Sequence, residues 1–246
     1  MTSGALGRNI SRETGLDKSV GALKAWSWEH IRWFGQSAFL LRSDAGQTAF
    51  IDPYRVPAQA GPADLILVTH PHPDHYDHAS IDGLRKRETV IVLPRTGAES
   101  GQIPISAGET LQIGAFKIRG VAAYNLTRRF HPLSRGWLGY LVEVDGVRIY
   151  HAGDTDLVPE MADLRPDVAL LPVGGLFAMN GRAAAEAAHV LKASLCIPMH
   201  FGLLLGGRGA GARFVHRLGE GGLTLPHERM RPFGPQKQMR PFGPQR

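Results

Sequence analysis

Short apolar segments separated by turn residues make up most of the chain between residues 33 and 199. Some alternate apolar and polar residues, as strands with one buried face do, whereas residues 65–69 are almost continuously apolar, as in strands covered on both faces. Two longer segments, 79–86 and 182–192, fit helices, and Asn180 is placed to cap the second. The expected strands cover residues 33–41, 47–51, 65–69, 89–93, 110–113, 116–124, 138–144, 147–151, 168–171 and 195–199.

Turn signals join several of these strands into hairpins. Gly114-Ala115 and Asp145-Gly146 each stand between two apolar segments, and an Asp-Gly pair strongly indicates a two-residue hairpin turn. Hairpins occur in both halves of the chain with helices between them. We therefore expect an α/β fold, in which two mixed β-sheets pack face to face and are covered by helices.

Composition divides the 246 residues into one body and two distinct ends. The net charge of +6 resides in residues 1–25 and 226–246, because residues 26–225 carry as many acidic as basic side chains. We expect an N-terminal extension over 1–25, one domain over 26–225, and a basic Pro/Gly-rich tail over 226–246 that contains a nearly duplicated segment. A neutral body does not favour nucleic acid as a partner.

The single cysteine, Cys196, excludes a disulfide framework and fits a reducing compartment. Its place in an apolar strand predicts a buried structural thiol. The sequence has no apolar segment of membrane-spanning length and no secretory signal pattern. We therefore expect a cytoplasmic protein.

The densest chemistry lies in Thr69-His70-Pro71-His72-Pro73-Asp74-His75, directly after the apolar strand 65–68. Imidazole and carboxylate ligands suit zinc, iron or manganese. Asp154 and His200 also follow expected strands, as His70 does. Side chains at matching strand ends converge on one cleft, so we expect a shared metal site.

These residues resemble the metallo-β-lactamase-fold superfamily, whose four-layer αββα sandwich matches the expected architecture. Further segments, including Trp33–Phe39, Ile51–Tyr54, Leu171–Gly175 and Ile197–His200, resemble the branch of metal-dependent hydrolases that includes L-ascorbate-6-phosphate lactonase. The resemblance covers about residues 28–204.

The resemblance implies a site for two divalent ions, most readily zinc, with manganese or iron as alternatives. It implies that His70 and His72 hold the first ion, that Asp74, His75 and His200 hold the second, and that Asp154 bridges the two. Asp52 matches an aspartate that supports such sites through hydrogen bonds. Asp52 as a simple turn former before Pro53 is the alternative.

One position departs from the family pattern. Asn125 stands where the family has a further histidine for the first ion, and asparagine is a poor zinc ligand. Three histidines lie between His75 and Asp154, namely His78, His131 and His151, and we favour His131 as the ligand. Otherwise the first ion is under-coordinated or absent. Gln36 also stands where related chains often have histidine.

Other histidines are assigned lesser roles. His151, three residues before Asp154, is expected to support the site by hydrogen bonding. His78 is interpreted as a local cap of the following helix.

The expected chemistry is hydrolysis. A metal-bound hydroxide would attack an ester, lactone or phosphodiester, and Asp74 would position the water and shuttle its proton. A mononuclear iron redox enzyme on the same fold and a non-catalytic ligand-binding relative are the alternatives. Arg128, Arg129 and Arg182, with Arg135, would favour an anionic small-molecule substrate if they face the cleft, whereas solvated arginines would not.

Overall fold

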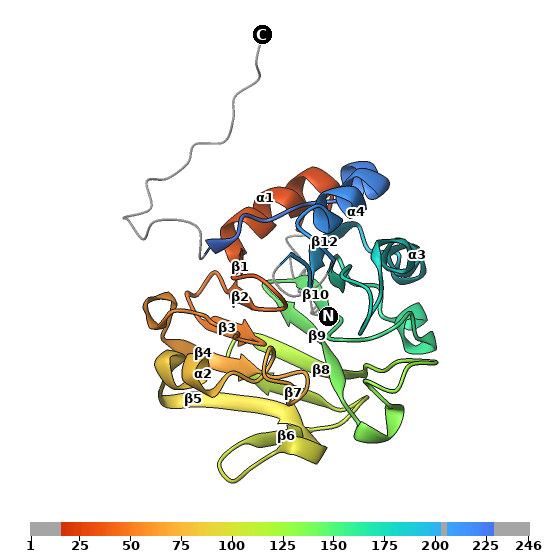
Figure 1. Cartoon of the computed structure of the whole chain (residues 1–246). Coiled ribbons are helices and arrows are strands. Elements are labelled where there is room, and N and C mark those ends of the chain that lie inside the picture. Colours follow the sequence, from red (N-terminus) through yellow and green to blue (C-terminus); the bar gives the residue numbers. More distant parts are fainter. Residues whose placement is uncertain (1–15, 203–205, 229–246) are drawn as a thin grey trace, which may run out of the picture.

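The computed structural model describes residues 16–202 and 206–228. Within these residues the chain forms two six-stranded sheets that pack face to face (Figure 1). Most of the expected N-terminal extension and both copies of the duplicated tail segment lie outside the described residues. Among the described helices, none has the length and apolar character needed to cross a membrane.

The first sheet has the strand order β1-β2-β3-β4-β5-β6. Strands β1 to β3 pair antiparallel, whereas β3 to β6 run parallel. Its strands are β1 Ile31–Trp33, β2 Phe39–Arg42, β3 Thr48–Ile51, β4 Ala63–Leu67, β5 Arg85–Pro94 and β6 Ile103–Ile105.

The second sheet has the order β12-β11-β10-β9-β8-β7. Strands β10, β11 and β12 run parallel, and β7 to β10 pair antiparallel. Its strands are β7 Thr110–Ile113, β8 Phe116–Ala122, β9 Leu138–Val144, β10 Val147–His151, β11 Val168–Pro172 and β12 Leu195–Met199.

Alternation along the strands builds the layers. Ile51 and Leu67 of the first sheet share one buried core with Tyr140 of the second, while Phe50 and Ile66 point to the opposite face. That outer face packs under helix α2 (His78–Leu84). Each fully buried Ile, Leu or Phe contributes about 1.5–3 kcal/mol.

The second sheet is covered by α3 (Gly181–Leu191) and α4 (Ala210–Leu218). Helix α1 (Val20–His30) contacts β1, β2 and β12 at one end of both sheets (Figure 1). Two mixed sheets flanked by helices are the four-layer sandwich expected from the sequence, which is thereby confirmed.

Several elements differ from the expected ones. Strand β6 was not expected, and Arg85 and Lys86, expected at the end of a helix over 79–86, begin β5. Helix α1 runs through the expected boundary at residue 25 and buries Leu23. The strand expected over 33–41 is interrupted between β1 and β2, where Gly35 and Gln36 adopt left-handed φ values of 92° and 50°. Helix α4 was not expected at all.

The loops that follow the parallel strands of the two sheets meet. Leu138 N donates to Thr69 O at 3.1 Å, which joins the loop after β4 to the start of β9. His200 N, directly after β12, donates to Gln36 O at 2.9 Å. The carboxyl ends of β4, β10 and β12 therefore open toward one place, as expected for a site in a sheet with parallel strands.

Candidate metal centre

The loop after β4 carries the histidine motif into a tight turn. His75 N and Tyr76 N both donate to His72 O, at 2.9 and 2.8 Å, so the loop folds back on itself before α2. His70 and His75 are buried, while His72 is half-buried. Asp77 caps α2 by accepting from Ala79 N, so the expectation that His78 is the cap is wrong.

Asp154 reaches the same place from the second sheet. The loop that carries Asp154 leaves β10 through Gly153, whose φ of 64° favours glycine. There is also no room for a side chain, since a Cβ at Gly153 would lie 2.9 Å from Leu138 O. His200 enters from β12 with a left-handed φ of 55°. Backbone strain of this kind is characteristic of functional sites.

Seven side chains converge in three overlapping groups, within each of which the potential ligand atoms lie within 4.8 Å of one another. The groups are His70, His72 and His131; His70, His75 and Asp154; and Asp74, His75 and His200. We call these seven residues the metal cluster. Every residue predicted from the sequence to hold a metal lies in it, and Asn125 does not.

Asp154 lies at the middle of the cluster. Its Oδ2 is 3.1 Å from His200 Nε2 and 3.6 Å from His131 Nε2, and its Oδ1 is 3.6 Å from His75 Nε2. His200 Nε2 also lies 3.6 Å from Asp74 Oδ2. The Asp154 carboxylate therefore lies near His131 of the first group and near His75 and His200 of the third.

Asn125 and His131 occupy different roles in the structure. Asn125 Oδ1 lies 3.1 Å from His131 Nδ1, and Asn125 Nδ2 donates to Phe177 O at 2.9 Å. The second bond fixes the amide orientation, so Nδ1 of His131 carries the proton and Nε2 faces the cluster.

Asp52 anchors the histidine loop through contacts with Thr69 and His75. This buried carboxylate accepts from Thr69 N and Thr69 Oγ1, each at 2.7 Å, and lies 2.6 Å from His75 Nδ1. Thr69 Oγ1 also lies 3.0 Å from His70 Nδ1. These contacts direct Nε2 of both histidines toward the cluster, which is how supporting carboxylates orient ligating imidazoles.

His151 supports the loop that carries Asp154. Its buried ring lies 2.9 Å from Ser37 O through Nε2 and accepts from Gly153 N through Nδ1. Burial lowers the pKa of His151, which fits a neutral ring. This geometry matches the hydrogen-bonding role expected from the sequence.

Two contacts of the cluster were not expected. Gln36 Nε2 donates to Asp74 Oδ2 at 2.9 Å, and Gln36 O accepts from both His200 N and Trp33 Nε1. The Trp137 ring packs against His70, His72 and His131, with centroid distances of 5.0, 4.9 and 5.4 Å. The substitution at Gln36 was the one available signal for the first contact; the second had none.

Charges within the cluster separate into two regions. Burial lowers the pKa of His70 well below its ordinary value and that of His131 to about 4. Burial opposes protonation of His75 and His200 too, but Asp154 and neighbouring carboxylates raise the pKa of His75 well above the ordinary value and that of His200 to about 9. His70 and His131 are thus neutral, whereas His75 and His200 are cationic rings paired with carboxylates.

The donor set fits divalent metal ions. Among the described residues, five buried atoms of the cluster have no hydrogen-bond partner: His75 Nε2, His131 Nε2, both ring nitrogens of His200, and Asp154 Oδ1. Such atoms cost about 1–3 kcal/mol each when left unsatisfied. Imidazole nitrogens and carboxylate oxygens that share one place are the ligands that zinc, manganese and iron accept.

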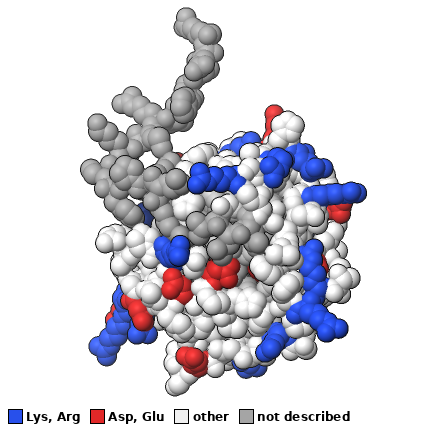
Figure 2. All heavy atoms as spheres, viewed as in Figure 1, with Lys and Arg blue, Asp and Glu red and all other residues white. Residues whose placement is uncertain are grey.

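The predicted substrate arginines do not form one group. Arg128 Nη1 donates to Ala178 O at 2.8 Å and lies 3.4 Å from Asp156 Oδ1, and Arg129 is exposed. Arg182 pairs with Glu186 and lines a cavity of about 370 Å³ between α3 and α4, whose lining includes no cluster residue. Lys and Arg side chains gather over these two helices (Figure 2). Arg135 is nearer, since its charge contributes to the lowered pKa of His72, after burial and His75.

Cys196 is buried in β12, as expected, and burial raises the pKa of its thiol to about 12. A thiol held protonated in this way is a poor nucleophile.

Comparison with known proteins identifies the family of this chain. A family model described as beta-lactamase superfamily domain matches residues 30–200. A UPF0173 metal-dependent hydrolase of Thermococcus kodakarensis is 34% identical over 191 residues, covering 70% of this chain and 84% of the relative. One of Rubrobacter xylanophilus is 31% identical over 227 residues, covering 82% and 93%.

A solved structure from Parabacteroides distasonis, assigned to the metal-dependent hydrolases, is 29% identical to this chain. It superposes with a TM-score of 0.68 and covers 79% of this chain and 91% of its own. The chain therefore belongs to the metallo-β-lactamase superfamily and, within it, to the UPF0173 family of metal-dependent hydrolases.

Proposed function

We propose that this chain uses two divalent metal ions to hydrolyse an ester-type bond in a small molecule. The observation that carries the proposal is that four residues of the metal cluster, His75, His131, Asp154 and His200, have buried side-chain atoms without a hydrogen-bond partner. His70, His72 and His131 would hold one ion, Asp74, His75 and His200 the other, and Asp154 would lie between them. Zinc suits this imidazole-rich set best.

Two such ions supply Lewis acidity and lower the pKa of water toward neutrality. The residues of the chain provide the geometry. The Asp74 side chain is 24% exposed, whereas that of Asp154 is 3% exposed, so Asp74 is the carboxylate that an incoming water meets. The hydrogen bond from Gln36 fixes Asp74 Oδ2, which lets the carboxylate orient that water.

Carboxylic esters, lactones and phosphodiesters are the candidate substrates. A lactone would agree with the resemblance to the lactonase branch. An anionic group is supported by Arg135 alone among the four arginines, because its charge acts on His72. Arg128 is engaged with Asp156, and Arg182 lies at a separate cavity.

The test is a hydrolysis screen with metal-depleted chain reloaded with zinc, manganese or iron. A p-nitrophenyl ester, a lactone and bis-p-nitrophenyl phosphate represent the three substrate classes. We expect turnover of at least one class, lost in Asp154→Ala and His200→Ala and retained in His216→Ala, which alters an exposed histidine of α4. Unchanged activity in both cluster variants, or one iron per chain with oxygen consumption, would contradict the proposal.

A further inference from the structure

Exposed apolar side chains concentrate on two loops, one of which carries the cluster residue His131. Leu126, Phe130 and Leu133 lie on the loop between β8 and β9, and Leu176 lies on the loop between β11 and α3. Their exposed fractions are 58%, 48%, 57% and 59%, the four largest among the exposed large apolar residues described. We call these four residues, with the half-buried Phe177, the apolar rim.

The rim is joined to the cluster through Asn125. The rings of Phe130 and Phe177 meet edge to face, with centroids 4.7 Å apart. Phe177 O accepts from Asn125, whose Oδ1 lies against His131, the residue after Phe130. The two loops are thus fastened to each other and to a cluster histidine.

Trp137 extends the apolar surface to the cluster itself. Its half-buried ring packs against His70, His72 and His131. His72 is half-buried and is therefore one of the cluster residues that a substrate can reach. The indole ring therefore provides an apolar surface beside His72.

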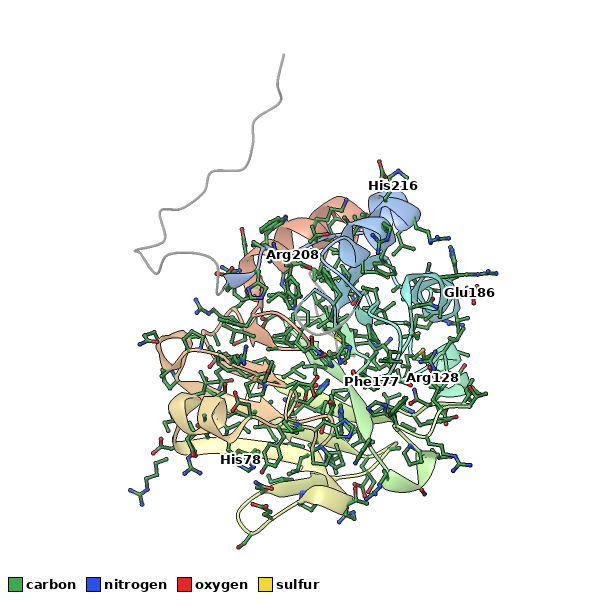
Figure 3. The ribbon with its side chains drawn as sticks, in the orientation of Figure 1. His78, Arg128, Phe177, Glu186, Arg208 and His216 are labelled. Carbon is green, nitrogen blue, oxygen red and sulfur yellow. The ribbon has the colours of Figure 1, made fainter. Side chains whose placement is uncertain are left out.

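One cation of the loop that carries the rim, Arg128, is engaged in an ion pair. Arg128 and Phe177 are neighbours in Figure 3, and the Arg128 guanidinium donates to Ala178 O and pairs with Asp156. Its charge is therefore largely balanced at the rim. Exposed apolar surface that borders a site is typical of a surface that binds a ligand.

We propose that the apolar rim binds an apolar group of the substrate, an alkyl chain or an aromatic ring, beside the bond that the cluster cleaves. The inference rests on the proposed function, because the metal cluster must hold the reacting end of the same molecule. It names a substrate class, since esters or lactones with an apolar substituent fit this surface better than small polar ones.

The test measures binding, independently of turnover. Alkyl hydroxamates chelate divalent metals, so we would titrate acetohydroxamate through octanohydroxamate into zinc-loaded protein by calorimetry. We expect affinity to rise about two- to fourfold for each added methylene, as partial to full burial of that group predicts. Phe130→Ala and Leu176→Ser should reduce the ratio of octanohydroxamate to acetohydroxamate affinity at least about fivefold.

Val190→Ser is the matched control, because Val190 is an exposed apolar residue of α3 with an exposed fraction of 37%. It should leave the affinity ratio unchanged. Affinity that does not depend on chain length, or an equal loss in Val190→Ser, would overturn the inference.

Three other results have distinct meanings. A concentration-dependent dimer that Leu176→Ser dissociates would assign the rim to contact between copies and would overturn the inference. Absence of binding even by acetohydroxamate would remove the metal site, and the proposed function with it. Chain-length-dependent binding without hydrolysis of any ester would contradict the proposed function while supporting an apolar ligand.

Discussion

Asn125 Oδ1 lies 3.1 Å from His131 Nδ1, and the two residues also exchange backbone contact, since Asn125 N donates to His131 O at 2.8 Å. The Asn125 amide therefore contacts Nδ1 of the His131 ring, on the side away from the cluster. Asn125 stands where the family has a ligand histidine, and it supports the site as expected by orienting another ligand candidate, His131. His131 Nε2 reaches the cluster from a different part of the same loop.

This relationship predicts different effects for two substitutions at one position. Asn125→Leu removes the acceptor and should weaken binding at the first metal about 10- to 100-fold, whereas Asn125→Asp keeps an acceptor and should retain tighter binding than Asn125→Leu. Competition with a chromogenic chelator measures both affinities. Equal affinity in the two variants would mean that Asn125 does not orient His131.

Gln36 provides a second prediction, because its side chain donates to Asp74 Oδ2 at 2.9 Å. Gln36→Leu should weaken binding of the second ion by about 10- to 100-fold through loss of that bond. Gln102→Leu is the control, since Gln102 is likewise a bonded glutamine but donates to Tyr76 OH. Equal metal affinity in the two variants would show that Gln36 does not hold the site.

Gly153 and Gly146 form a matched pair for stability. Both have positive φ, 64° and 76°, but a Cβ at Gly153 would lie 2.9 Å from Leu138 O, whereas one at Gly146 meets nothing within 4 Å. Gly146→Ala should cost about 1 kcal/mol from its backbone conformation alone. Gly153→Ala should cost at least about 1 kcal/mol more in urea unfolding, because backbone atoms must shift. An equal loss of unfolding free energy in the two variants would contradict the close contact between residue 153 and Leu138 O.

The pKa of His131 predicts how the metal-free protein responds to acid. Burial lowers that pKa to about 4, below the value of about 6.5 in an unfolded chain. Below pH 6.5 the unfolded state binds the proton first, so the free energy of unfolding falls between pH 6.5 and 4, by up to about 3 kcal/mol.

Replacing His131 with Asn removes this contribution. Urea unfolding in the presence of a chelator should therefore show a wild-type stability advantage that shrinks from pH 7.5 to pH 4.5. A stability difference that stays constant over this range would argue that His131 titrates normally in the folded state.

Regular alternation and strong turn residues made part of the fold predictable. The hairpin of β9 and β10 around Asp145-Gly146 and the final strand β12 have the bounds expected from the sequence. Helix α1 was missed because it buries little, with Leu23 and Ser27 as its buried residues, so its sequence shows no clear apolar face. The break after β1 was missed because glutamine rarely adopts the left-handed conformation found at Gln36.

The cluster residues that directly follow a strand were predictable from the sequence. His70, Asp154 and His200 each follow a buried strand. Asp154 and His200 follow parallel strands of the second sheet, and His70 follows β4 of the first sheet, which packs face to face with it. The contacts of Asn125, Gln36 and Trp137 depend instead on the paths of irregular loops, which no periodic pattern encodes. The structure also separates Arg182 from the cluster, since it lies on the first turn of α3 and pairs with Glu186.

We propose that the seven residues of the metal cluster bind two metal ions. Elemental analysis of zinc-saturated protein, after removal of free metal, tests it directly. We expect two ions per chain in the wild type, and a loss of bound metal in both His131→Ala and His200→Ala. One ion or none in the wild type, or full metal content in both variants, would contradict the account.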